Sequence, residues 1–104
     1  MNESAKPEAA GTVLLTHANG LHARPSIKFN KLAKKFSSLI EFGAAPEGPW
    51  TDAKSIVKVN AARVRQGSVL HIRAAGSDAH AAVAALVGLV ERDFDEAGAD
   101  VTDG

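Results

Sequence analysis

The chain has 104 residues, with 12 Lys and Arg side chains and 12 Asp and Glu side chains, so its formal net charge is zero. This balance argues against bulk binding to nucleic acid or to a membrane surface, which usually requires a basic excess. The absence of cysteine excludes disulfides, thiol chemistry and thiolate metal sites. With 45% hydrophobic residues and no apolar run near the roughly 18 residues of a membrane span, we expect one small, soluble, cytoplasmic domain.

The two ends of the chain lack hydrophobic periodicity, which predicts a flexible leader over 1–10, a flexible tail over 97–104 and one folded domain over 11–96. Thr12 to His17 has the length and the β-branched content of a strand. Asn19 and Gly20 favour a turn after it, because both residue types tolerate positive φ. From Ala23 the apolar residues take helical spacing, which predicts the first helix: Phe29, Leu32, Ala33 and Phe36.

The central segment predicts a hairpin followed by a short helix. Ser38 to Phe42 alternates in polarity like a strand, and the connector 43–50 (GAAPEGPW) has too much glycine and proline for regular structure. Trp50, expected to be a packing residue, and Thr51 begin the returning strand. Lys54 to Ala62 then predicts a short helix capped by Ser55.

The last third of the domain predicts a strand and a long helix. Ser68 to Ala74 alternates most cleanly, and Ser77 or Asp78 is expected to cap a helix whose inward residues run from Val83 to Val90. The order β-α-β-β-α-β-α predicts an α+β fold, an open-faced two-layer β-sandwich with a four-stranded antiparallel sheet and three helices on one face.

His22 and Arg24 lie where the first predicted helix begins. The first amides of a helix lack partners and attract anions, and Pro25 suits the first turn because its missing N–H is not needed there. Arg24 offers a forked donor to phosphate oxygens. The positive helix end disfavours the imidazolium, so His22 is expected to stay neutral and nucleophilic near pH 7. Attack on a phosphoryl donor would give an N-phosphohistidine, with no metal or cofactor required. The simpler alternative makes His22 a helix cap and Arg24 a solvated charge.

The segment 20–26, G-L-H-A-R-P-S, resembles the active-site motif of the HPr family, the histidine-containing phosphocarriers of the bacterial phosphoenolpyruvate-dependent sugar phosphotransferase system. Lys54-Ser55-Ile56 with Val59 resembles the family's second motif, and the resemblance covers roughly 11–96. It implies that phospho-Enzyme I phosphorylates His22 on Nδ1 and that the group passes to a histidine of an enzyme IIA-type acceptor, with Arg24 balancing the phosphate. The chain would then be a phosphoryl-transfer intermediate rather than a self-sufficient enzyme.

The same resemblance makes Ser55 a candidate regulatory site, because a dedicated kinase phosphorylates the family's serine in some bacteria. A phosphate there would add negative charge to the docking face and repel acidic partners. The alternative is a plain helix cap, worth about 1 kcal/mol.

A carrier that meets several partners is expected to be a monomer with an apolar patch near His22 and a basic rim. The candidates for the patch and then for the rim are Leu21, Ile56 and Val57, and Lys28, Lys31 and Lys58. The chain departs from the family at Lys58 and Asn60, where many members have glycine and methionine, and in its longer connector 43–50. These departures bear on the choice of partner.

Two other functions fit the sequence. One is an HPr-like module of a regulatory or dihydroxyacetone-kinase phosphorelay, and the other is a binding module that acts through Ser55 while His22 is incidental. A metal site is not expected, because His17 and His22 lack helical i, i+4 spacing and a carboxylate partner, and His71 and His80 are expected to face solvent.

Overall fold

The structure, a computed structural model, describes residues 8–95. Its elements confirm the predicted order: β1 (Glu8–Leu14), α1 (Arg24–Ala33), β2 (Leu39–Gly43), β3 (Thr51–Asp52), α2 (Ile56–Ala62), β4 (Val69–Ala75) and α3 (Ala79–Glu91), followed by a short 3-10 turn, η2 (Asp93–Asp95). Within this range, none of the helices combines the length and the apolarity that crossing a bilayer requires.

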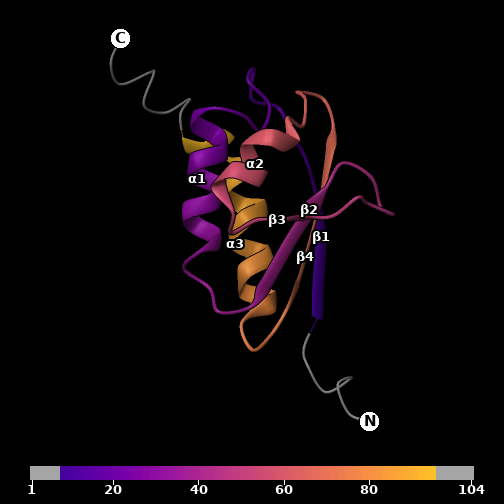
Figure 1. Cartoon of the computed structure of the whole chain (residues 1–104), viewed down its shortest axis with the longest axis vertical. Coiled ribbons are helices and arrows are strands. Elements are labelled where there is room, and N and C mark those ends of the chain that lie inside the picture. The colour runs from indigo at the N-terminus through magenta and orange to yellow at the C-terminus, as the bar shows by residue number, and fades with distance from the viewer. Residues whose placement is uncertain (1–7, 96–104) are drawn as a thin grey trace.

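The strands form one four-stranded sheet in the order β1-β4-β2-β3, and every neighbouring pair is antiparallel. The three helices cover one face and leave the other open, so the predicted open-faced sandwich is confirmed (Figure 1). Alternation along β4 explains this arrangement, since Leu70, Ile72 and Ala74 are buried under the helices while Val69 and Arg73 are exposed.

The first strand is displaced from its predicted position. It begins at Glu8 rather than Thr12, and Glu8 to Ala10, assigned to the flexible leader, pair with Ala75 to Arg73 of β4. Glutamate and alanine are poor strand formers, so only the backbone ladder to β4 reveals this extension. At the other end the chain leaves the sheet after Leu14, and His17 lies in a turn. The remainder of the predicted leader and the predicted tail lie outside the described residues.

The core is built from aliphatic side chains around two aromatic contacts. Phe29 of α1 meets Phe42 of β2 edge to face, with ring centroids 5.4 Å apart. Phe94, which periodicity did not single out, is fully buried, and its ring lies 5.8 Å from that of His17. The residues of η2 therefore contribute to the core next to the loop that precedes α1.

The two predicted helix caps behave differently. Ser55 is confirmed as the N-cap of α2, where its Oγ accepts the N–H of Lys58 at 3.3 Å. Asp78 is the N-cap of α3, but its carboxylate makes no capping hydrogen bond to that helix. It accepts instead from the backbone N–H groups of Ser37 and Ser38, both at 2.9 Å, and from the Ser38 hydroxyl. These hydrogen bonds, led by that of the Ser38 hydroxyl, lower the pKa of Asp78 from 3.8 to about 2.

The connector between β2 and β3 packs on the open face of the sheet. Trp50 precedes β3, so its predicted place in the returning strand is wrong. Its ring packs instead under the guanidinium of Arg73, 3.9 Å from the ring centroid, and Arg73 forms an ion pair with Glu41 at 2.8 Å. This cluster lies on the face that the helices leave uncovered.

Candidate functional site

The loop between β1 and α1 presents His22 through a bridge to the segment after α2. Leu21 forms an isolated antiparallel bridge with Val64, to whose carbonyl it donates its N–H at 2.8 Å. Gly20, with φ 62, permits this approach, because a Cβ there would lie 2.2 Å from the carbonyl oxygen of Val64. The backbone before His22 is thus held by residues more than forty positions further along the chain.

Leu21 does not belong to an exposed patch. Its exposed fraction is 0%, and it lies in the core together with Val64, so its predicted docking role is wrong. Successive residues of an extended segment point to opposite sides. The side chain before a solvent-accessible histidine therefore turns inward, and His22 itself is half-exposed.

The start of α1 is capped from outside the helix. Its N-cap is Ala23, with φ 56 and ψ −130, so the alternative in which His22 is the cap is wrong. The side chain of Asn60, from α2, takes this function, because its Oδ1 accepts the N–H of Ala23 at 3.1 Å and lies 3.1 Å from the hydroxyl of Ser26. The N–H of Ala23, one of the amides that the sequence predicted to be open to an anion, is therefore already hydrogen-bonded to Asn60.

The ring of His22 also meets Asn60. Its Nδ1 lies 3.4 Å from the backbone carbonyl oxygen of Asn60. A carbonyl only accepts, so this contact favours the tautomer with hydrogen on Nδ1 and the lone pair on Nε2. At 3.4 Å the contact is long, and a small rotation of the ring releases it.

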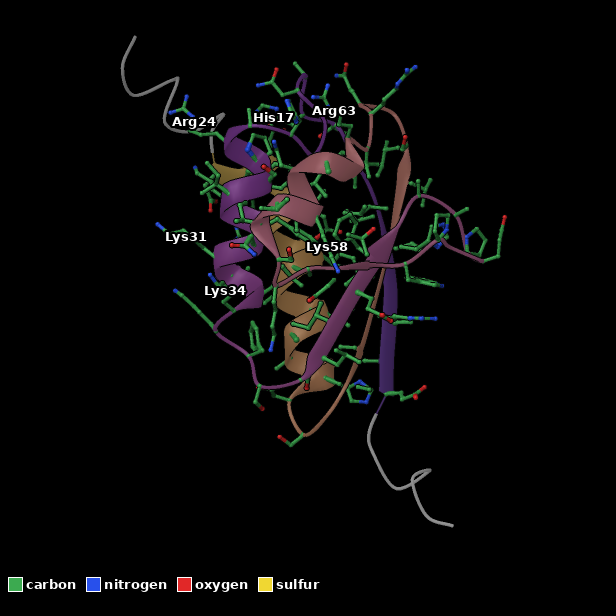
Figure 2. All side chains as sticks on the ribbon, viewed as in Figure 1. His17, Arg24, Lys31, Lys34, Lys58 and Arg63 are labelled. Atoms are coloured by element: carbon green, nitrogen blue, oxygen red, sulfur yellow. The ribbon has the colours of Figure 1, made fainter. Side chains whose placement is uncertain are left out.

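Basic side chains gather at the end of the molecule where α1 begins. Arg24 is the first residue of α1, is exposed, and projects outward from that helix end (Figure 2). Arg63 and His17 lie at the same end (Figure 2). Sequence reasoning did not single out Arg63, which becomes a neighbour of the site only through the bridge between Leu21 and Val64.

An apolar groove lies beside these residues, between α1 and α2. Val57, Ile27 and Ile56 are exposed to 75%, 47% and 38%, and together with Ala23, Asn60 and Arg63 they line it. The sequence did not predict Ile27 as a groove residue. The helical period identifies the side chains that face the core, but it does not identify which exposed side chains line a groove.

The candidate rim lysines differ in exposure. Lys31 and Lys58 are exposed. Lys28 is half-buried, and its Nζ donates to the carbonyl of Phe94 at 2.9 Å, so its predicted place on an open rim is wrong. Its ammonium group thereby joins α1 to η2.

Comparison with known proteins agrees with this geometry. A family model for the phosphorylation site of the HPr component of the phosphotransferase system matches residues 10–92. The chain is 42% identical over 73 residues to the phosphocarrier protein HPr of Haemophilus influenzae, covering 70% of this chain and 84% of that protein. It is 36% identical over 85 residues to the multiphosphoryl transfer protein of the same species, covering 81% of this chain and 17% of that protein. Its structure is similar to that of HPr-C-His from Thermoanaerobacter tengcongensis, with a TM-score of 0.77, 37% identity and coverage of 84% of this chain and 96% of that one.

Proposed function

Because the chain belongs to the HPr family of phosphocarriers of the phosphotransferase system, we propose that His22 is the residue that accepts and releases the phosphoryl group. One observation supports this assignment above others. A half-exposed imidazole is held at the start of α1 by a backbone bridge, with Arg24 at the first helical position. We therefore favour a phosphocarrier over a binding module that acts only through Ser55, because a binding module would not need an accessible histidine at position 22.

The chemistry requires only the ring and its surroundings. The lone pair on one ring nitrogen of His22 forms a P–N bond, while the bond between phosphorus and the donor breaks and its electron pair returns to the donor. The hydrogen on the second nitrogen of His22 stays in place. Reaction at Nδ1 further requires the ring to turn away from the carbonyl of Asn60, and its hydrogen to move from Nδ1 to Nε2 by exchange with solvent water, so that the lone pair lies on Nδ1. Transfer to the acceptor is the same step in reverse, so positioning and charge stabilisation account for most of the catalysis.

Arg24 balances the charge that arrives. A phosphorylated side chain carries about −1.5 to −2 charges near neutral pH. The Ala23 amide already bonds to Asn60, so the guanidinium of Arg24, with its forked donors, is the group best suited to bind the phosphoryl oxygens.

The partners follow from the family and from the surface. Membership of the phosphotransferase system implies exchange with its enzymes. We assign Enzyme I as the donor and an enzyme IIA-type domain as the acceptor, both meeting a cytoplasmic monomer. The apolar groove of Ile27, Ile56 and Val57, with Lys31 and Lys58 nearby on α1 and α2, suits an apolar patch with an acidic margin.

Ser55 offers a means of regulating that docking. Its Oγ caps α2 and precedes the exposed pair Ile56 and Val57. A phosphate on this oxygen would place negative charge at the edge of the groove and weaken binding to an acidic partner. A serine kinase would then act on the same surface that Enzyme I uses.

Phosphorylation of the full chain tests the assignment of His22. With phosphoenolpyruvate and Enzyme I, intact mass should show one acid-labile phosphoryl group, and coupling to phosphorus in NMR spectra should identify Nδ1. His22→Ala should reduce uptake at least a hundredfold, because the nucleophile is absent. His80→Ala, which removes an exposed histidine at the start of α3, is the matched control and should keep full uptake. Uptake that survives in His22→Ala contradicts the assignment.

A further inference from the structure

Arg63 occupies a backbone conformation that favours glycine. It is the C-cap of α2, with φ 49 and ψ 49, in the left-handed region. Helices that end in this conformation usually have glycine there, because a Cβ is penalised. The chain nevertheless has an exposed arginine at this point. Backbone geometry does not favour arginine here, which directs attention to what its side chain can reach.

The bridge brings Arg63 close to His22. Leu21 pairs with Val64 in antiparallel orientation, so His22 follows the bridge on one segment and Arg63 precedes it on the other. The two partners of an antiparallel bridge have Cα atoms about 5 Å apart, and residues one step beyond the bridge therefore remain near each other. Leu21 and Val64 are buried in the core, whereas His22 is half-exposed and Arg63 is exposed.

Two further observations support a role for this guanidinium. Arg63 lines the same groove as Asn60, whose backbone carbonyl oxygen lies 3.4 Å from Nδ1 of His22. Across residues 8–95, its guanidinium takes part in no hydrogen bond or ion pair, whereas Arg73 and Arg92 are paired with carboxylates. A cation next to the nucleophile is thus left available for an anion.

We propose that Arg63 binds the phosphoryl group on His22 from the side opposite Arg24, and that it is a second phosphate-contacting residue of the site. This inference rests on the proposed function of His22. Arg24 approaches from α1 and Arg63 from the end of α2, so the phosphoryl oxygens lie between two guanidinium groups. Both cations stabilise the charge on the transferring group, and Arg63 favours uptake by the carrier.

The test measures phosphoryl uptake by the full chain from two donors, phospho-Enzyme I and the small molecule phosphoramidate. Arg63→Gly should stay folded, since glycine is the residue this conformation favours. It should lose about fivefold in uptake rate from both donors, because the contact is to the phosphoryl group and not to the partner. In phosphorylated Arg63→Gly, the 31P resonance should titrate with a midpoint about half a pH unit higher than in the phosphorylated parent. The parent's guanidinium disfavours protonation of the phosphoryl group, and the variant lacks it. Arg63→Lys, which keeps the charge without the fork, should lose about twofold.

Lys34→Ala is the matched control, because it removes one exposed positive charge at the other end of α1 (Figure 2). It should leave the uptake rate and the 31P midpoint unchanged. If Arg63 only complements the C-terminal end of α2, Arg63→Gly will change the melting temperature and leave both phosphoryl readouts as in the parent, which overturns the proposal. Failure of the parent protein itself to take up phosphate on His22 would instead refute the proposed function.

Discussion

Next to His22, the backbone adopts a conformation that L-amino acids rarely occupy. Ala23 has φ 56 and ψ −130. Such conformations cost about 1–3 kcal/mol and persist where the surroundings determine them. Here the surroundings are Asn60, which accepts the Ala23 N–H, and the bridge of Leu21 to Val64. The strain therefore lies at the junction that presents the imidazole to solvent.

Relief of this strain is measurable. Ala23→Gly should raise the free energy of unfolding by about 1 kcal/mol, because glycine adopts positive φ freely and the relief exceeds the added entropy of the unfolded chain. Urea denaturation of the two proteins measures the difference. Ala84→Gly, an exposed position inside α3, is the control and should lose about 1 kcal/mol. A loss of similar size in Ala23→Gly would show that the conformation is not strained.

At the scale of the elements, a single carboxylate joins α3 to the segment that leads into β2. Asp78 accepts two backbone N–H groups and the hydroxyl of Ser38, forty residues away in the chain. Because these bonds lower the pKa of Asp78 to about 2, below the roughly 3.9 of an unfolded aspartate, the carboxylate form stabilises the folded state. That stabilisation is complete above about pH 4 and is lost as the pH falls toward 2.

Asp78→Asn should remove this pH dependence. The variant should be less stable than the parent at pH 6, and the difference should shrink as the pH falls from about 4 to about 2, where the parent aspartate becomes protonated. Urea midpoints at several pH values measure it. Glu47→Gln, an exposed carboxylate in the connector, is the control and should follow the parent at every pH. A constant difference between Asp78→Asn and the parent across this range would contradict the prediction.

At the scale of the whole molecule, a net charge of zero leaves room for a locally basic surface. Arg24, Lys31, Lys58 and Arg63 all belong to the helical layer and its ends, which include the candidate site (Figure 2). Glu41 lies on the open face of the sheet, paired with Arg73. The molecule therefore presents a basic, partly apolar surface to an acidic partner while remaining neutral as a whole.

Charge changes on this surface should slow docking. Lys58→Glu and Ser55→Glu should each reduce the rate of phosphoryl uptake from Enzyme I about threefold to tenfold at low salt, and the loss should diminish as ionic strength rises. Stopped-flow transfer assays measure the rate. Ser55→Ala controls for loss of the cap and Lys34→Glu for net charge, and both should transfer at nearly the parent rate. Equal effects of Lys34→Glu and Lys58→Glu would argue against docking on α2.

Local signals in the sequence determined much of this protein. The period along 23–36, the alternation along 68–74 and the cap at Ser55 each depend on neighbours within a few residues, and each recurs in the structure. The same holds for the position of His22 and Arg24 at the start of a helix, which a motif of seven residues predicts. These features could be predicted because a helix turn or a strand pleat involves only adjacent side chains.

Tertiary structure alone decided which distant residues complete the site. Asn60 reaches the Ala23 amide across 37 positions, and the bridge of Leu21 to Val64 buries one predicted docking residue and brings in Arg63. β1 begins early because its backbone pairs with β4, and Lys28 leaves the rim because its ammonium group meets Phe94. Each of these contacts joins segments that are far apart in the sequence, so no local pattern could predict it. A local pattern sets the shape of an element, but only packing of the elements sets what its side chains touch.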